Sequence, residues 1–501
     1  MFKNIISLYK VSLGVLIIII ITEITTSFQI SHLDMLPAKY FALIIATFVL
    51  IDILISLLIF RKSDSQGNKK HTFSRILGYT LSVLMIIGLI FLGQAIEKVQ
   101  ETVTSVTQEA EISAVVDFYV LKDNPASKLE DASGYSLAVT ESFDWENTKT
   151  ALASIEEQEL LEISTATYST VFAMVDALYA KEVDGLLLNS AYVDILEEME
   201  LYADFTERVK NIWSYNVHEV VSDVEEIPVQ EEVKEDDDTF VMYLSGSDTR
   251  SKVLKTSRSD VNILAVVNTR THQVLLINTP RDYYIGNPAG GGALDKLTHC
   301  GIYGVECSMG ALEELYNEES DYYGQINFTG FEMMIDAVGG VDVYSEVAFT
   351  TPYGNHKIKQ GMNHLNGAEA LGFARDRYSL KGGDNARGKN QMKIIAALID
   401  KMSASNIVTN YTEILESLQG MFVTNITSEE ISALVKMQLS DMPNWDVKSY
   451  AVTGRGDSAR TYSMPGMNAY VMRPNQETVE RAIELIDKVV SGEVLIDEDV
   501  R

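Results

Sequence analysis

Cysteine and histidine are scarce in this sequence, which holds two Cys and seven His among 501 residues. There is no Cys-x-x-Cys pair and no His-rich spacing, so the sequence argues against a zinc site. The two cysteines, Cys300 and Cys307, have six residues between them. A disulfide is chemically permitted if they lie outside the cell membrane, and two small buried thiols are the alternative.

Basic residues are also in deficit. The chain has 40 Lys and Arg against 71 Asp and Glu, which gives a formal net charge of −31. Such a balance argues against nucleic-acid binding through bulk electrostatics. An anionic ligand must instead be held by a local cluster of cations that acts against the overall negative field.

Long apolar runs, by contrast, are present and confined to the first hundred residues. Segments 5–28, 38–60 and 73–96 are each close to the roughly 20 residues that a helix needs to cross a bilayer. A cleavable signal peptide has one shorter run, so three runs in succession predict a retained anchor of three transmembrane helices over residues 1–97.

The charges of the short loops predict the orientation of this anchor. The first loop carries only Lys39 with Asp34, whereas the second carries five basic residues against Asp64. The positive-inside rule therefore places the second loop and the N-terminus in the cytoplasm. We expect a multi-pass protein of the cell membrane whose C-terminal domains are extracellular. The basic residues of the second loop are Arg61, Lys62, Lys69, Lys70 and Arg75.

Two further regions follow the anchor. Residues 98–222 alternate strand-like and helix-like patterns and predict a small accessory α/β domain, with a helix from Asp194 to Lys210. Residues 223–238 are dominated by acidic side chains and lack aromatic residues, so they predict a solvated linker. An acidic interaction tail is the alternative for that segment.

Residues 239–501 predict the largest domain. Strand patterns at Val261–Asn268 and Gln273–Asn278 are joined by four residues, which indicates a β-hairpin. Helical patterns follow, and a mixed β-sheet flanked by helices is the expected α/β architecture. The predicted helices are 308–316, 329–338, 387–402, 428–438 and 476–490.

Polar residues gather where these strands begin or end. Asp248 follows a strand in a Gly-Ser loop, and Arg258 and Asp260 precede the next strand. Arg281 follows a third strand, and Lys296 comes shortly after it. Taken singly, these residues fit turn aspartates and solvated surface charges. Loops at strand ends are also where a rigid sheet displays functional groups.

The segment from residue 372 to residue 399 carries the clearest chemistry. If Phe373–Ser379 is extended, Arg375 and Arg377 project from the same face of the strand. Arg387 and Gln391 lie four apart on one face of the helix that follows. Three arginines and a glutamine beside a helix N-terminus predict a phosphate site. The alternative is an amphipathic helix with a polar first turn and surface arginines.

These motifs, in their order, resemble the LytR-CpsA-Psr family of cell-wall assembly enzymes. They are SGSD, SRSD, TPRD, DKLTH, FARDRYS and GGDNARGKNQ. The resemblance is close over about residues 240–400 and loose over the rest of the region after the anchor. A three-span anchor followed by an accessory α/β domain is similar to the CpsA-like branch associated with streptococcal capsule.

The resemblance implies an enzyme that moves a phosphate-linked glycopolymer, such as capsular polysaccharide or a teichoic-acid-like polymer. The donor is a polyprenyl-pyrophosphate carrier and the acceptor is a sugar hydroxyl of peptidoglycan. It implies Mg²⁺ as cofactor, with Mn²⁺ as an alternative, and membrane lipid and other capsule-assembly proteins as partners. By the same resemblance, the catalytic residues are Arg258, Arg281, Arg375 and Arg377, further pyrophosphate ligands are Lys296, Arg387 and Gln391, and the metal ligands are Asp248 and Asp260.

Two other functions remain open at this stage. One is a non-catalytic envelope scaffold that binds the lipid-linked polymer, and the other is a regulator of capsule synthesis. Direct DNA binding is argued against by the shortness of the predicted cytoplasmic segments. The general base is not identifiable from the sequence, and Asp282 and Asp384 are the candidates.

Overall fold

The computed structural model describes residues 2–60, 69–107, 114–141, 144–157, 162–217, 238–250, 254–377, 379, 383–403, 418 and 420–501. The chain forms two compact units. The first comprises Met1–Gln108, Ser403–Gln419 and Ile426–Asn444, and the second comprises Glu109–Met402, Gly420–Asn425 and Trp445–Arg501.

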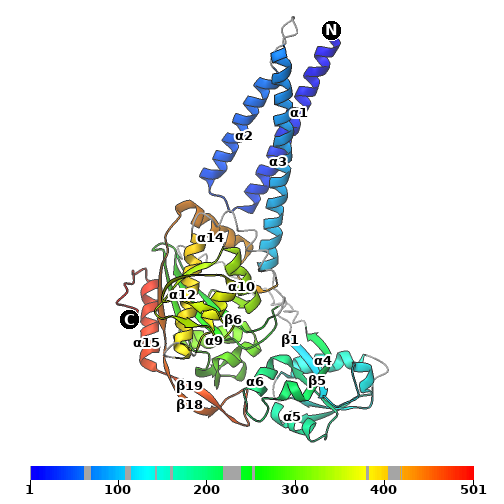
Figure 1. The fold of residues 1–501 in the computed structure, drawn as a ribbon, viewed down its shortest axis with the longest axis vertical. Coiled ribbons are helices and arrows are strands. Elements are labelled where there is room, and N and C mark those ends of the chain that lie inside the picture. Colours follow the sequence, from blue (N-terminus) through cyan, green and yellow to red (C-terminus); the bar gives the residue numbers. More distant parts are fainter. Residues whose placement is uncertain are drawn as a thin grey trace. The chain divides into compact units, whose positions relative to one another are not determined.

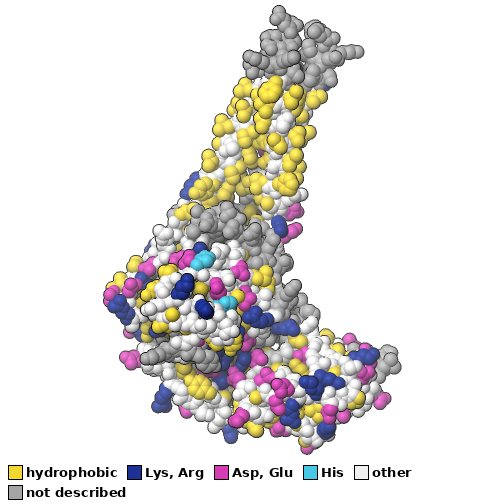
Figure 2. Space-filling model, viewed as in Figure 1, with side chains coloured by type: hydrophobic (Ala, Val, Ile, Leu, Met, Phe, Trp, Pro, Cys, Tyr) yellow, Lys and Arg dark blue, Asp and Glu magenta, His cyan; other side chains and the backbone are white. Residues whose placement is uncertain are grey.

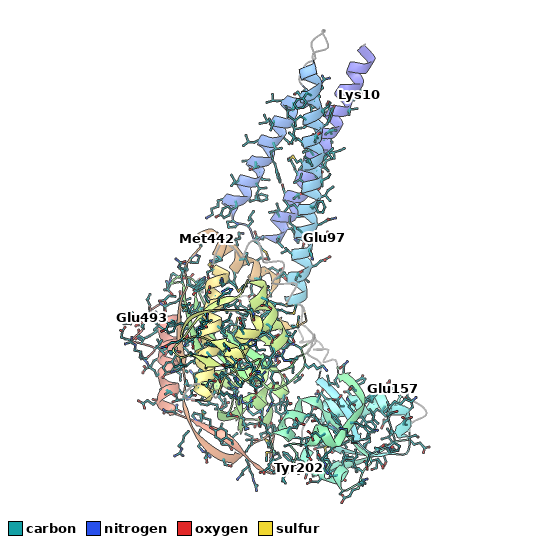
Figure 3. All side chains as sticks on the ribbon, in the orientation of Figure 1. Lys10, Glu97, Glu157, Tyr202, Met442 and Glu493 are labelled. Carbon is teal, nitrogen blue, oxygen red and sulfur yellow. The ribbon has the colours of Figure 1, made fainter. Side chains whose placement is uncertain are left out.

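The described part of the first unit includes three long helices and the shorter helix α14 (Figure 1). Their apolar stretches Lys10–Leu33, Ala38–Ile59 and Phe73–Thr104 are each long and apolar enough to cross a membrane. Figure 2 shows hydrophobic side chains covering the described surface of these helices. Lys10 and Glu97 lie toward opposite ends of this apolar bundle (Figure 3). The helices are α1 (Phe2–Leu33), α2 (Ala38–Ile59), α3 (Lys69–Thr107) and α14 (Ser428–Asp441).

In the second unit, residues 114–217 form an accessory α/β fold. Its described residues make a five-stranded mixed sheet of order β3-β2-β4-β1-β5. Strand β1 is buried on both faces, because α5 packs on one side and α4 on the other. The strands are β1 (Ala114–Leu121), β2 (Ser136–Thr140), β3 (Ser164–Tyr168), β4 (Gly185–Asn189) and β5 (Val209–Val217), and the helices are α4 (Trp145–Glu156), α5 (Val171–Tyr179), α6 (Val193–Glu197) and α7 (Phe205–Arg208).

One predicted element of this region is wrong. The sequence pattern predicted a helix from Asp194 to Lys210, but two short helices and the start of β5 occupy this stretch. Strand β5 pairs antiparallel with β1, and Trp213 stacks on Tyr215 along it. Aromatic and β-branched residues of β5 therefore gain more by completing the sheet than by extending a helix.

The rest of the second unit is built on a larger sheet. In the described residues this sheet has six strands in the order β16-β11-β6-β7-β8-β17, and it mixes parallel with antiparallel pairs. The predicted hairpin is present as β7 and β8, with the predicted bounds. The strands are β6 (Thr239–Ser247), β7 (Val261–Asn268), β8 (Gln273–Asn278), β11 (Tyr322–Asn327), β16 (Phe422–Thr424) and β17 (Asp446–Ala451).

Helices cover both faces of this sheet, as the alternation along β7 requires. Leu264 and Val266 point into a core shared with α9 and α15, whereas Ile263 and Ala265 pack with Met392 of α12. Antiparallel ribbons and further helices surround this core. These elements are α8 (Leu297–Cys300), α9 (Val305–Tyr316), α10 (Phe328–Ala337), α11 (Gly367–Ala374), α12 (Asp384–Ser403), α15 (Gln476–Val490), β9 (Tyr284–Asn287), β10 (Ala293–Lys296), β12 (Val341–Ser345), β13 (Phe349–Thr350), β14 (Lys357–Ile358), β15 (Gly361–Leu365), β18 (Gly454–Arg460) and β19 (Asn468–Pro474).

The predicted linker, residues 223–238, lies outside the described residues except for its last residue. The two cysteines are described and are free, buried thiols, which matches the alternative to a disulfide. The Cys307 thiol donates a hydrogen bond to the Asn287 side-chain oxygen at 3.2 Å.

Candidate functional site

Four of the predicted site residues meet at one edge of the six-stranded sheet. Asp248 follows the end of β6, and Arg258 and Asp260 lead into β7. Because β6 and β7 are antiparallel, the end of one strand lies beside the start of the other. Arg281 follows the end of β8, which lies at the same edge. The loops of three neighbouring strands thus bring two arginines and two aspartates together.

Ion pairs connect these side chains. The Arg281 Nη1 atom donates to Asp260 Oδ1 at 2.8 Å, and Arg258 Nη2 lies 3.8 Å from Asp248 Oδ2. From α12, Arg387 Nη2 lies 3.4 Å from the Asp260 carbonyl oxygen. Arg387 and Gln391 are both buried, as expected for one face of this helix. Helix α12 thus adds a further cation to the cluster at the sheet edge.

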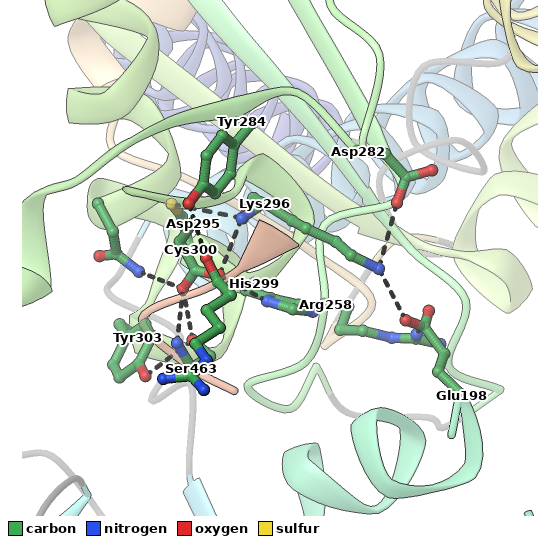
Figure 4. Close-up of polar contacts among 12 residues, drawn as sticks. Glu198, Arg258, Asp282, Tyr284, Asp295, Lys296, His299, Cys300, Tyr303 and Ser463 are labelled. Carbon is green, nitrogen blue, oxygen red and sulfur yellow. Dashed lines mark hydrogen bonds and ion pairs between the residues drawn. The ribbon is translucent and has the colours of Figure 1, made fainter. Parts of the chain in front are cut away.

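Lys296 reaches the same cluster from the end of β10. Its side chain is 5% exposed, and its Nζ atom lies 3.6 Å from Asp282 Oδ1. Directly before it, Asp295 anchors a buried network. Asp295 contacts His299 Nδ1 at 2.7 Å and accepts a hydrogen bond from Ser463 Oγ at 2.6 Å (Figure 4). A lysine whose neighbours are held in this way has little freedom to turn toward solvent.

Burial and charge act differently on the two predicted metal ligands. Burial alone would raise the pKa of Asp260, but Arg281, Arg258 and Arg387 outweigh it and hold that pKa below its usual value. Burial raises the pKa of Asp248, and the charge of Asp260 adds to this effect. The repulsion between these two carboxylates is one that a divalent cation would relieve.

These two carboxylates suit Mg²⁺ in type and number. Mg²⁺ is commonly held by one or two carboxylates together with water and substrate phosphates. In the part of the chain that the structure describes, no group of three or more His, Cys, Asp or Glu residues is arranged to hold a metal. A complete protein cage is therefore absent from this region, and a metal at Asp248 and Asp260 would share its shell with a ligand.

The predicted strand at Phe373–Ser379 is wrong. Residues up to Ala374 belong to helix α11, and Arg375 is its C-cap residue. The helix is favoured locally because Asn366 and Glu369 form a capping box at its start. Arg375 and Arg377 therefore do not project from one strand face, although both are half-buried on the loop that follows α11.

Arg375 nevertheless belongs to the surroundings of the site. Its guanidinium group lies 3.9 Å from the centre of the Tyr353 ring and 4.4 Å from that of Phe328. Its charge also acts on Asp248, whose pKa it lowers in opposition to burial. Stacking on two rings orients this arginine without consuming its hydrogen-bond donors.

Two residues of the cluster, Asp194 and Glu198, were not predicted, and Asp194 Oδ2 lies 3.7 Å from Arg258 Nη2. Glu198, just after α6 of the accessory fold, places its carboxylate among three predicted phosphate ligands, of which Figure 4 labels Arg258 and Lys296. Its carboxylate accepts hydrogen bonds from Arg258 Nη1 and, at 3.0 Å, from Lys296 Nζ, and it lies 3.5 Å from Arg281 Nη2. Although burial opposes it, these cations lower the pKa of Glu198 to about 2. Its local sequence resembles any acidic helix end, so no sequence signal identified it.

Two buried donors in the cluster form no hydrogen bond within the part of the chain that the structure describes. The Nε–H groups of Arg258 and Arg281 are buried, and no hydrogen-bond acceptor for them occurs among the described residues. Leaving buried charged donors unsatisfied is costly unless a ligand completes them. The arrangement therefore suits an anion with several oxygen atoms, such as a phosphate or pyrophosphate.

Comparison with known proteins adds to this geometry. The sequence model of the LytR_cpsA_psr family matches residues 207–481. The polyisoprenyl-teichoic acid–peptidoglycan teichoic acid transferase TagU of Bacillus cereus is 33% identical over 196 residues, which are 39% of this chain and 63% of that protein. TagU of Bacillus anthracis is 30% identical over 238 residues, 45% of this chain and 77% of that protein. The chain thus spans just under two thirds of the first relative's length.

Solved structures are similar over about half of the chain. The crystal structure of B. subtilis TagV has a TM-score of 0.43 at 26% identity and covers 52% of this chain and 100% of that chain. A structure of TagT bound to LI-WTA has a TM-score of 0.41 at 25% identity and covers 50% of this chain and 91% of that chain.

Proposed function

Because the chain belongs to the LytR_cpsA_psr family, we propose that it transfers a phosphate-linked glycopolymer from a polyprenyl-pyrophosphate carrier to a sugar hydroxyl of peptidoglycan. The observation that carries this proposal is the cation cluster of Arg258, Arg281, Lys296 and Arg387 at one sheet edge. In a chain with a net charge of −31, such a local cluster of cations suits a specific anionic ligand. The named activity of the TagU relatives supports the same donor and acceptor classes.

The site has the groups that phosphoryl transfer needs. The acceptor hydroxyl oxygen attacks the phosphorus next to the polymer, and a new P–O bond forms. The bond from that phosphorus to the bridging oxygen breaks, and polyprenyl monophosphate leaves with the electron pair. Arg258 and Arg281 would bind the phosphate oxygens through their remaining donors and neutralise the charge that develops. Positioning and electrostatics supply most of the catalysis in such reactions, so no covalent nucleophile is required.

Two carboxylates complete the proposal. Asp248 and Asp260 would hold Mg²⁺, or Mn²⁺ in its place, and a bound cation would add charge neutralisation at the phosphates. Asp282, one of the two candidates for the general base, lies beside Lys296 and Arg281. It would accept the proton of the attacking hydroxyl.

The surroundings of the reaction follow from the anchor. We place the accessory and catalytic regions on the extracellular side, where peptidoglycan is found, with membrane lipid as the source of the polyprenyl carrier. Capsular polysaccharide or a teichoic-acid-like polymer would be the cargo, and other capsule-assembly proteins would be partners.

A reconstituted assay tests this function. The full chain, in lipid with Mg²⁺, is given a polyprenyl-pyrophosphate-linked saccharide and peptidoglycan fragments. We expect release of polyprenyl monophosphate and a new phosphodiester on the peptidoglycan, both detected by mass spectrometry. Arg281→Ala should abolish turnover, whereas Arg455→Ala, at an exposed position of β18, should not.

The assay also separates an enzyme from a scaffold. A scaffold would bind the lipid-linked saccharide through the same arginines but release no polyprenyl monophosphate. Wild-type protein that binds without turnover, in the presence of both Mg²⁺ and acceptor, would contradict the proposed transferase activity.

A further inference from the structure

The accessory fold and the catalytic region lie in one compact unit and share an apolar core. Phe172 and Leu196 of the accessory fold belong to the same buried cluster as Ile302 and Met464 of the catalytic region. At its border, the hydroxyl groups of Tyr192 and Tyr303 are 3.2 Å apart. This apolar seam, which contains Phe172, Leu196, Ile302 and Met464, holds the end of helix α6 against the catalytic region. The residue that follows α6 in the chain is Glu198.

Glu198 engages the cations in the way that a phosphate group would. One carboxylate oxygen is bonded to Arg258 and lies 3.5 Å from Arg281, while the other oxygen accepts from Lys296. The Glu198 side chain is 23% exposed, although the residue as a whole, with its backbone, is exposed. An anion from a separate fold therefore occupies the point where three proposed pyrophosphate ligands converge.

We propose that Glu198 is an internal competitor of the substrate pyrophosphate, and that the accessory fold must withdraw it before the lipid carrier binds. The inference rests on the proposed function, because it assigns these cations to the pyrophosphate. Without the pyrophosphate, Glu198 pairs with all three cations, and Asp194 Oδ2 also lies 3.7 Å from Arg258 Nη2. Once pyrophosphate oxygens reach Arg258, Arg281 and Lys296, the glutamate is left without its cations and beside a like charge.

Such competition has a defined thermodynamic sign. If the ligand binds only when Glu198 is withdrawn, its apparent Kd equals the intrinsic Kd divided by the fraction of molecules in which the glutamate is withdrawn. Removing the charge should therefore tighten binding. If Glu198 only oriented the arginines, its substitution would have the opposite effect on affinity. The cations would then be misplaced, and binding would weaken.

The test measures binding of farnesyl pyrophosphate, with Mg²⁺, to the full chain in detergent by titration calorimetry. Glu198→Gln keeps the shape of the side chain and removes its charge. Glu200→Gln is the matched control, since Glu200 is exposed two residues further on and the net charge changes equally. We expect Glu198→Gln to bind about tenfold more tightly than wild type, as for a site that is open about one tenth of the time. Glu200→Gln should match wild type.

The outcomes separate this inference from the proposed function. Equal binding by wild type and Glu198→Gln, or weaker binding by Glu198→Gln, would overturn the competition while leaving the pyrophosphate site in place, provided that Arg281→Ala abolishes binding. Binding that Arg281→Ala leaves unchanged, or no binding by any variant, would overturn the proposed site and the competition together.

Hydrogen exchange gives a second readout that does not depend on a variant. Withdrawal of Glu198 should loosen the end of α6, so adding farnesyl pyrophosphate to the wild type should speed amide exchange over residues 193–200. Slower exchange there on binding would mean that the ligand strengthens the contact, and it would overturn the inference.

Discussion

At the scale of single residues, the two predicted metal ligands differ in how much of the fold depends on them. The Asp260 side chain is 13% exposed and lies among three arginines, whereas the Asp248 side chain is 28% exposed. Asp260→Asn should destabilise the protein by about 3–5 kcal/mol, because it leaves buried cations without their partner. Asp248→Asn should change the unfolding free energy much less, although both variants should lose turnover. Chemical denaturation of each variant, beside the activity assay, measures this difference, and equal stability losses would contradict it.

Also at this scale, the contribution of Glu198 to protein stability should not depend on pH near neutrality. Its pKa is lowered from 4.5 to about 2 by Lys296, Arg258 and Arg281, so its stabilising effect is complete above pH 4.5. That effect is lost as the pH falls from 4.5 through 2. The difference in Tm between wild type and Glu198→Gln should therefore be constant from pH 5 to pH 8 and shrink below pH 4.5. A difference that changes between pH 6 and pH 7 would show that another group controls the contact.

At the scale of elements, the capping box at the start of α11 stabilises the helix that ends at Arg375. Asn366 accepts from the Glu369 backbone N–H, and the Glu369 side chain accepts from the Asn366 backbone N–H. Asn366→Ala should cost about 0.5–2 kcal/mol of stability, the usual effect of losing an N-cap. Glu369→Gln should cost less, since glutamine can also complete a capping box. Denaturation curves of both variants test this order, and a larger loss for Glu369→Gln would contradict it.

At the scale of the whole molecule, the anchor should place its basic second loop and the region that follows the anchor on opposite sides of the membrane. In a background with Cys300 and Cys307 replaced by alanine, Ser491→Cys should react with an impermeant thiol reagent in intact cells. Position 491 is exposed at the end of α15. Ser65→Cys, in the basic second loop, should react only after permeabilisation. The reverse pattern would contradict the orientation and, with it, the extracellular reaction.

The sequence by itself determined the elements whose signals are local. The bounds of β7, β8 and α15 agree with the patterns that predicted them. Apolar residues alternate along a strand and recur about every 3.6 residues along a helix, so both patterns depend only on residues close together in the chain. The order of polar motifs at strand ends was equally legible. Through the family resemblance, that order implied that Asp248, Arg258, Asp260 and Arg281 belong to one site, and the antiparallel register of the sheet brings them to one edge.

Only the tertiary structure decided the features that depend on distant partners. The sequence alone does not distinguish a strand from a helix in the segment before Arg375, because the capping box and the packing of α11 decide between them. The residues of β5 form a strand rather than a helix because they pair with β1. Glu198 lies 98 positions before Lys296 and 60 before Arg258. No local pattern encodes such a contact, because its free energy comes from burying an apolar seam between two folds and from pairing charges that meet only when that seam has formed.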